Sequence, residues 1–186
     1  MRNILNLCWR LLVIALVAGL ALGVVHAVTE QPIAKQALAA AEEARKTVLP
    51  QAAAFEPNAD ETVYVGRDAA GAVVGFVTSG ETKGFGGVIE VTVGLSVDGT
   101  ITGISVGGSG FKETAGLGAK TKDAAFTDQF IGKSDELTAV KHGTASTDQQ
   151  IDAVSGATIS SRAVTNEVNA LTAILTAFQA DYAGGK

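Results

Sequence analysis

The sequence predicts an α+β protein in which an N-terminal transmembrane helix precedes a mainly antiparallel sheet with flanking helices. Three observations support this prediction. Residues 11–28 form an apolar run without a formal charge, residues 62–106 hold short alternating runs separated by glycine-rich turns, and residues 159–182 repeat apolar side chains at three- and four-residue steps. Strands that precede helices without regular βαβ alternation are typical of α+β folds.

The apolar run at residues 11–28 is long enough to cross a membrane as one helix. At about 1.5 Å per residue it spans about 27 Å, close to the roughly 30 Å of a hydrocarbon core. Arg2 and Arg10 precede the run and Glu30 follows it, so the positive-inside rule places the N-terminus in the cytoplasm and the remainder outside it. The alternative is a cleaved signal peptide, because residues 25–27 resemble a cleavage site. The length of the run and the helical sequence after it favour a retained, single-pass anchor in the cell membrane.

Residues 32–48 are rich in alanine with interspersed glutamate and lysine, which predicts a second helix. Pro32 is expected in its first turn, and Pro50 is expected to end it. The apolar stripe of this helix is thin. Two interpretations remain open: the helix packs on its own domain, or it is a stalk that lifts the domain off the membrane or contacts a partner.

Strands are expected in the region that follows. Residues 62–65 and 72–78 are predicted to be short strands joined by a turn, and residues 88–97 alternate between apolar and polar side chains. The apolar face of this third strand is therefore expected in the core, and the face that carries Glu90, Thr92 and Ser96 is expected in solvent.

The rest of the chain changes from strands to helices. The pair Asp98-Gly99 is a hairpin signal, so a return strand is expected at residues 100–106. A short helix with its two phenylalanines inward is expected at residues 123–132. Residues 137–141 are predicted to form the last strand, before the long helix at residues 159–182.

Composition excludes several classes of function. The net charge is −5, and the lysine and arginine residues do not form blocks, so no nucleic-acid partner is expected. The single cysteine, Cys8, precedes the apolar run, and His26 and His142 lie far apart in the sequence. This set cannot form an internal disulfide, an iron–sulfur cluster or a zinc finger, and no metal site is expected. Any redox chemistry must therefore come from an organic cofactor.

The most informative segment is residues 152–161, DAVSGATISS, in which small and hydroxyl-bearing residues lead into the long C-terminal helix. Unpaired backbone N–H groups and the helix dipole favour an anion at such a helix start. Gly156 and Ala157 leave room for a bulky group to approach. Ordinary N-capping by serine and threonine is the simpler interpretation of the same residues.

This segment resembles the flavinylation motif of FMN-binding domains, which occurs in the G subunit of Rnf electron-transport complexes and in the C subunit of sodium-pumping NADH:quinone reductases. The resemblance implies that Thr158 is the acceptor, joined to FMN by a phosphoester through its hydroxyl oxygen. It also implies that a separate flavin transferase, using FAD and a divalent metal, installs the group. A neutral threonine hydroxyl is a weak nucleophile, so it needs the activation that such an enzyme supplies. No catalytic residue is expected in the chain itself.

Three further segments agree with the resemblance. Residues 111–118, FKETAGLG, resemble the family's ETPGLG loop, with Ala115 in place of the usual proline. In the family this loop lies along the flavin ring and offers hydrogen bonds to it; an ordinary surface loop is the alternative. Residues 83–89, KGFGGVI, resemble the glycine-rich start of the family's central strand. Residues 140–143, VKHG, are the fourth match. Lys141 in this segment is a candidate to hold the FMN phosphate, with a solvated side chain as the alternative.

The expected cofactor-binding residues come from the segment around the acceptor, from the fourth segment and from the ETAGLG loop. They are Thr158 with Asp152, Ser155, Gly156, Ala157, Ser160 and Ser161, then Lys141, and finally Glu113, Thr114, Gly116, Leu117 and Gly118.

Three parts are expected: a cytoplasmic N-terminus and anchor at residues 1–29, the alanine-rich helix at residues 30–55, and a domain at residues 56–186 on the extracytoplasmic side, which the resemblance implies is an FMN-binding domain. The compact length favours the Rnf G subunit over its quinone-reductase relative. The implied function is electron transfer through covalent FMN within a complex that couples ferredoxin and NAD to ion translocation. The implied partners are the other subunits, the flavin transferase and membrane lipid. The alternative function is a flavin-binding sensor or scaffold outside the electron path.

Overall fold

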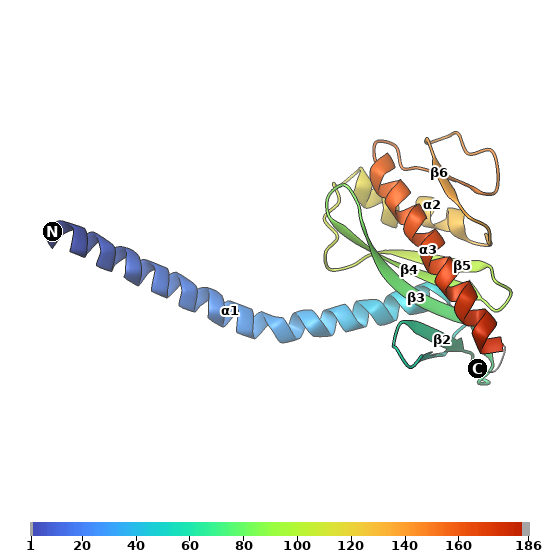
Figure 1. The fold of residues 1–186 in the computed structure, drawn as a ribbon, viewed down its shortest axis with the longest axis horizontal. Coiled ribbons are helices and arrows are strands. Elements are labelled where there is room, and N and C mark those ends of the chain that lie inside the picture. Colours follow the sequence, from blue (N-terminus) through green and yellow to red (C-terminus); the bar gives the residue numbers. More distant parts are fainter. Residues whose placement is uncertain (1, 184–186) are drawn as a thin grey trace. The chain divides into compact units, whose positions relative to one another are not determined.

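The computed structural model describes residues 2–183 (Figure 1). The side chain of Arg2, one of the two cations ahead of the apolar run, lies outside the described part, as do Met1 and residues 184–186. Contacts between residues divide the chain into two compact units, Met1–Ala40 and Ala41–Lys186. The first unit is helical, and the second contains the sheet and every segment that the sequence associates with FMN.

Helix α1 covers Arg2–Val48 and continues through Pro32. The sequence predicted two helices with Pro32 in the first turn of the second, and that prediction is wrong. A proline removes one backbone hydrogen bond from a helix but does not always end it. The segment Asn6–Val48 is long and apolar enough to cross a membrane. Its apolar side chains are exposed, including Leu16 at 57% and Leu20 at 62%, so they offer a surface that lipid would cover.

The second unit is built on a five-stranded antiparallel sheet whose strands follow one another in sequence order. The strands are β1 Ala54–Pro57, β2 Val63–Arg67, β3 Val73–Lys83, β4 Val88–Ser96 and β5 Ile101–Gly107. The four strands expected between residues 62 and 106 are confirmed. Strand β1 was missed, and β3 extends to Lys83 because its polar second half pairs with β4.

The face of β4 that was expected in solvent is covered, so that expectation is wrong. Thr92 is 3% exposed and Gly94 is buried. The C-terminal end of α1 lies on this side of the sheet, where Val48 and Leu49 are fully buried and pack with Val77. The end of the alanine-rich helix therefore packs on its own domain.

Four glycines make room for the end of α1, one from each of four adjacent strands. We call this row the glycine slot: Gly66, Gly75, Gly94 and Gly103. A Cβ at Gly94 would overlap the carbonyl oxygen of Val48 and lie 2.6 Å from Thr102 Oγ1. The Thr102 hydroxyl donates to the Val48 carbonyl at 2.5 Å. The slot thus accepts helix backbone directly against sheet backbone.

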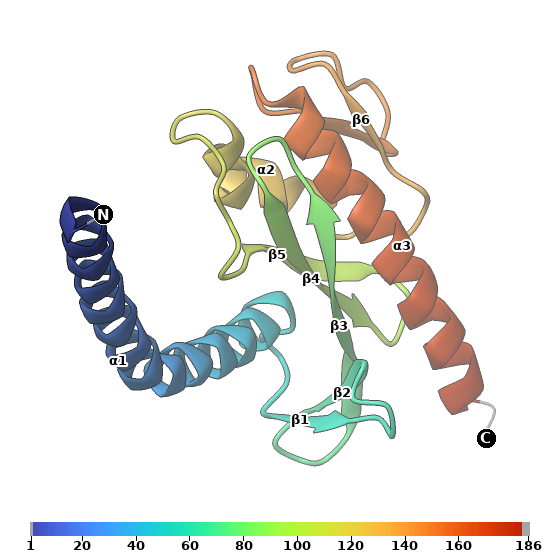
Figure 2. The same ribbon diagram turned by 60° about the vertical axis from the view of Figure 1, so that its left-hand side comes forward.

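The opposite face of the sheet is covered by α3, Thr158–Ala183. Figure 2 shows this helix running across the strands. Its buried residues include Val164, Val168 and Leu171, which belong to the main core with Val91 and Val93. The long amphipathic helix predicted from the periodicity is confirmed.

Short elements complete the core beside α3. They are η1 Gly118–Lys122, α2 Ala124–Thr127 and η2 Asp128–Phe130, and they bury the two phenylalanines that were expected to point inward. Strands β6 Thr138–Val140 and β7 Gln150–Asp152 form a parallel pair. The sequence predicted that residues 137–141 form the last strand, and that prediction is wrong because β7 follows them. Strand β7 was missed because three residues are too few to show a periodic pattern.

Glu167 supplies a test of the packing between α3 and β3. Its carboxylate faces Gly80, where an added Cβ would overlap Oε1, and burial raises its pKa above the ordinary value of 4.5. A raised carboxyl pKa means that folding stability falls as pH rises through that pKa. Glu167→Gln should therefore stabilise the full chain at pH 7 by about 0.5 kcal/mol, a small gain because solvent screens the charge. Thermal denaturation in detergent should show the gain at pH 7 and lose it below about pH 4; an equal gain at both pH values would contradict the electrostatic explanation.

Candidate functional site

The segment 152–161 forms a turn that leads from β7 into α3. The Ala157 N–H donates to the Val154 carbonyl at 2.9 Å, and Gly156 has a φ of 75°, a conformation that favours glycine. Thr158 is the first residue of α3 and is exposed. The predicted acceptor hydroxyl therefore belongs to a residue at an open helix start, on a turn with small neighbours.

Ser160 and Ser161 point inward, although both were predicted to bind the cofactor. Each is fully buried. The Ser161 hydroxyl accepts the Val154 N–H and donates to the Ala157 carbonyl, both at 3.0 Å. The Ser160 hydroxyl accepts the Phe85 N–H at 3.3 Å. In this structure the two serines fasten the turn and tie it to the β3–β4 connection.

That connection, residues 84–87, is the glycine-rich hairpin loop between β3 and β4, closed by the Gly84 N–H donating to the Gly87 carbonyl at 2.9 Å. Glu113 reaches it from the ETAGLG loop: Oε1 accepts the Gly86 N–H at 2.9 Å. A Cβ at Gly84 or Gly118 would overlap the Glu113 carboxylate. Glu113 thus holds its own loop against the hairpin, and the glycines leave space for its side chain.

The ETAGLG loop also reaches the turn before α3. A Cβ at Gly156 would lie 2.9 Å from Leu117 Cδ2. Within the loop, the Thr114 carbonyl accepts the N–H groups of Leu117 and Ala119, and Gly116 has a φ of 78°. The structure therefore brings together three of the four segments that the sequence singled out: the hairpin, the ETAGLG loop and the acceptor turn.

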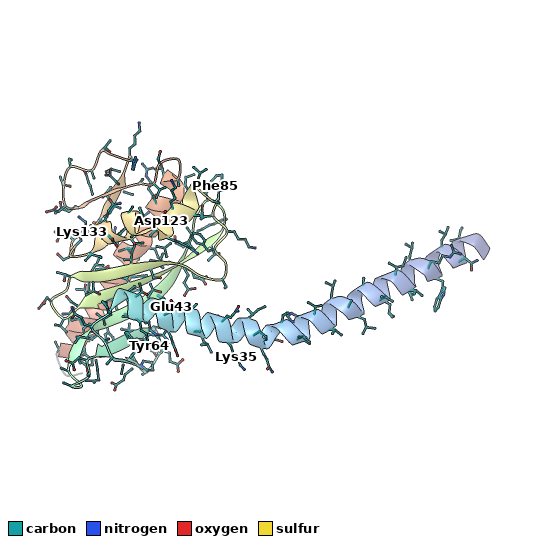
Figure 3. All side chains as sticks on the ribbon, turned by 180° about the vertical axis from the view of Figure 1, so that it is seen from behind. Lys35, Glu43, Tyr64, Phe85, Asp123 and Lys133 are labelled. Carbon is teal, nitrogen blue, oxygen red and sulfur yellow. The ribbon has the colours of Figure 1, made fainter. Side chains whose placement is uncertain are left out.

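Exposed apolar side chains surround the place where these segments meet. Phe85 is 74% exposed, Ile159 59% and Leu117 44%. Figure 3 shows Phe85 at one end of the domain, with Tyr64 toward the other end. Single exposed apolar residues need no explanation, but three beside the exposed Thr158 offer a surface for a flat aromatic ligand.

Asp152 and Lys141 lie beside this centre rather than in it. Asp152 Oδ1 accepts the N–H groups of Thr144 and Ala145, each at 3.0 Å. These bonds, with the one from Ala145 foremost, hold the pKa of Asp152 below its usual range. Lys141 is exposed at the end of β6. In this structure the Asp152 carboxylate therefore orders the loop that follows Lys141.

A cavity of about 580 Å³ opens on the Ser155 side of the turn. Lys120, Gln129 and His142 line it with polar groups, and Phe126 and Val154 contribute apolar ones. The sequence did not indicate the lining residues from η1, α2, η2 and the loop after β6. No spacing in the chain indicates that those elements meet. Asp152, Val154 and Ser155, which also line the cavity, belong to the segment 152–161 that the sequence did single out.

The donor groups at the start of α3 fit a phosphate. Within residues 2–183, the N–H groups of Thr158, Ile159 and Ser160 have no hydrogen-bond acceptor. Free N–H groups at the start of a long helix, together with its dipole, favour an anion at that position. A phosphate attached at Thr158 would lie beside these donors, so the residues present suit the cofactor that the sequence implied.

Comparison with known proteins agrees with this site. The model of the FMN-binding domain family matches residues 84–173, which include the hairpin, the ETAGLG loop and the start of α3. The fold and the site thus define an FMN-binding domain. The G subunit of the Na⁺-translocating ferredoxin:NAD⁺ oxidoreductase complex of Acetobacterium woodii is 39% identical over 180 residues, covering 86% of this chain and 85% of that protein. The G subunit of the ion-translocating oxidoreductase complex of Methanosarcina acetivorans is 34% identical over 179 residues, covering 90% and 92%.

The chain belongs to the family of G subunits of ion-translocating oxidoreductase complexes, which confirms the resemblance seen in the sequence. Two solved structures share the fold. The C subunit of the Na⁺-translocating NADH-quinone reductase of Parabacteroides distasonis aligns with a TM-score of 0.53 at 25% identity, covering 63% of this chain and 61% of that one. NqrC of Shewanella oneidensis aligns with a TM-score of 0.52 at 22% identity, covering 72% and 74%.

Proposed function

We propose that this chain is the membrane-anchored electron-transfer subunit of an Rnf-type complex, and that it carries one FMN bound covalently to Thr158. The complex couples electron transfer between ferredoxin and NAD to ion translocation, as the name of the Acetobacterium woodii relative states for its own complex. The observation that carries the proposal is the position of Thr158. It is an exposed residue at the free N–H end of α3, beside the hairpin and the ETAGLG loop.

Attachment is a group transfer without a change of oxidation state. The Thr158 oxygen forms a bond to the FMN phosphorus of FAD, the bond between that phosphorus and the oxygen bridging to AMP breaks, AMP leaves, and the hydroxyl proton is released. A flavin transferase with a divalent metal supplies the activation that a neutral hydroxyl lacks. The chain contributes an accessible acceptor, and its helix start stabilises the single negative charge of the resulting phosphodiester.

Bound FMN supplies transfer of one or two electrons between centres. The chain's residues determine where that chemistry takes place. The serines at 160 and 161 fix the acceptor turn, Glu113 fixes the ETAGLG loop to the hairpin, and Phe85 and Leu117 present apolar surface beside Thr158. A site held by several such contacts keeps a cofactor at a defined distance from its redox partners.

Intact mass spectrometry of the full chain, co-expressed with a flavin transferase, tests the proposal. We expect a mass increase of one FMN less one water, and a flavin fluorescence band that survives denaturing electrophoresis. A chain that reaches the membrane complex without this mass increase would refute covalent attachment.

The apolar helix anchors the chain in the membrane, and we propose that the FMN domain lies on the extracytoplasmic side. The proposal rests on Arg2 and Arg10 ahead of the apolar run. Lipid contacts the helix, and the other subunits of the complex contact the domain.

Alkaline phosphatase fused after Lys46 should be active, and a reporter that needs the cytoplasm should be inactive at the same position. N-terminal sequencing of the mature chain should show that it still begins ahead of the apolar run. A chain that begins at Val28 would contradict a retained anchor.

A further inference from the structure

Arg162 lies one helical turn after Thr158 on α3. Ser161 and Thr165 are fully buried, whereas Thr158 and Arg162 are both exposed, so these two residues share the solvent face of the helix. Residues four apart on a helix have Cβ atoms about 5–6 Å from each other. Long helical side chains also lean toward the N-terminus. The Arg162 side chain is therefore placed to lie over the helical turn that begins at Thr158.

The positive charge of Arg162 has no acidic neighbour on its helix. The residues three and four positions away are Thr158, Ile159, Thr165 and Asn166. Within residues 2–183 the one ion pair is formed elsewhere, by Arg67 and Glu56 on β2 and β1. A cation near a helix start also opposes the helix dipole. An anion at the first turn would pair with the Arg162 charge and would also offset its unfavourable interaction with the helix dipole.

We infer that Arg162 pairs with the phosphodiester that flavinylation places on Thr158, an inference that rests on the proposed function. The planar guanidinium matches the two free oxygens of a phosphodiester with parallel N–H donors. The free N–H groups of the first turn of α3 contact the same anion from the helix axis. Arg162 is a positioning residue: it holds the phosphate oxygens and takes no part in making or breaking a bond.

Lys141 is the matched comparison, because the sequence resemblance made it the candidate for the phosphate. It follows β6, whose Val140 pairs with Asp152 of β7, and its own carbonyl accepts from Thr144. Lys141 thus belongs to the loop ordered by the Asp152 carboxylate. Arg162 belongs to the helix that starts at the acceptor. Both side chains are exposed, so removing either charge should leave the core intact.

The test measures the rate of FMN incorporation into the full chain by flavin transferase and FAD, followed by fluorescence of the denatured band. The chains compared are the wild type, Arg162→Gln, Arg162→Lys and Lys141→Gln, each at low and high salt. We expect Arg162→Gln to load about three- to tenfold more slowly at low salt. The difference should shrink at high salt because the pair is exposed. Arg162→Lys should fall between the two, and Lys141→Gln, at the other candidate cation, should be slowed less than Arg162→Gln.

A second measurement is independent of loading rate. The ³¹P resonance of the finished phosphodiester should shift more in Arg162→Gln than in Lys141→Gln. A wild-type chain that loads fully while Arg162→Gln shows the same rate and the same resonance overturns the inference alone. Slowing that is equal at all salt concentrations, or confined to Lys141→Gln, also overturns it. A wild-type chain that takes up no FMN overturns the proposed function and this inference together.

Discussion

Thr158→Val should abolish covalent flavin on this chain. Valine keeps the shape of threonine but has no hydroxyl oxygen to form the phosphoester, so the loss should be complete. The denatured band should be colourless under ultraviolet light, and the intact mass should equal that of the unmodified chain. Because Thr158 is exposed, the substitution should change folding stability by about 0.5 kcal/mol or less.

Two control variants give the result its meaning. Thr158→Ser keeps a hydroxyl at the same backbone position and should retain part of the labelling. Ser155→Ala removes the other exposed hydroxyl of the segment and should leave labelling intact. If Thr158→Val still produced a fluorescent band that Ser155→Ala removed, the acceptor would be Ser155.

Gly94→Ala should be strongly destabilising, because the glycine slot has no space for a side chain at this position. The added Cβ would overlap the Val48 carbonyl oxygen and lie 2.9 Å from its carbon. The Val48 carbonyl cannot rotate away as a flexible side chain would. The whole end of α1 must therefore shift away from the sheet, and Leu49 must lose burial. We expect a loss of about 3 kcal/mol in the free energy of unfolding, the sum of overpacking and lost apolar burial.

Gly107→Ala is the matched control on the neighbouring strand. Its added Cβ would lie 3.6 Å from Lys122 Cε, an ordinary contact with a flexible side chain. Denaturant unfolding of the full chain in detergent should place Gly107→Ala within about 1 kcal/mol of the wild type. Limited proteolysis should cut Gly94→Ala faster near residues 41–49. Similar stabilities for the two variants would show that the end of α1 is not held by the slot.

The sequence was sufficient for the parts of the molecule with strong local patterns. The steps between Val164 and Leu175 predicted α3, and the alternation in residues 88–97 predicted β4. The acceptor segment was recognisable because its residues are contiguous. The meeting of Glu113 with Gly86, and of Leu117 with Gly156, joins segments far apart in the chain, and no local pattern specifies such contacts.

Two features that were not predicted, the covered face of β4 and the burial of Ser160 and Ser161, can be recognised in the sequence. Gly66, Gly75, Gly94 and Gly103 each interrupt a strand, and interior glycines in strands mark close approach of backbone. They indicated that the sheet face expected in solvent is covered. Ser160 and Ser161 fall on the same helical face as Val164 and Val168, so the periodicity of α3 already placed them inward.

The burial of Ser160 and Ser161 has a consequence for how the chain matures. The segment 155–161 offers four hydroxyls of similar chemistry, and the fold leaves only those of Ser155 and Thr158 on exposed residues. In the unfolded chain all four would be open to modification. Folding therefore removes the Ser160 and Ser161 hydroxyls from competition, so that a flavin transferase has to distinguish Thr158 only from Ser155. The proposed attachment at Thr158 therefore predicts that the domain folds before the flavin is attached.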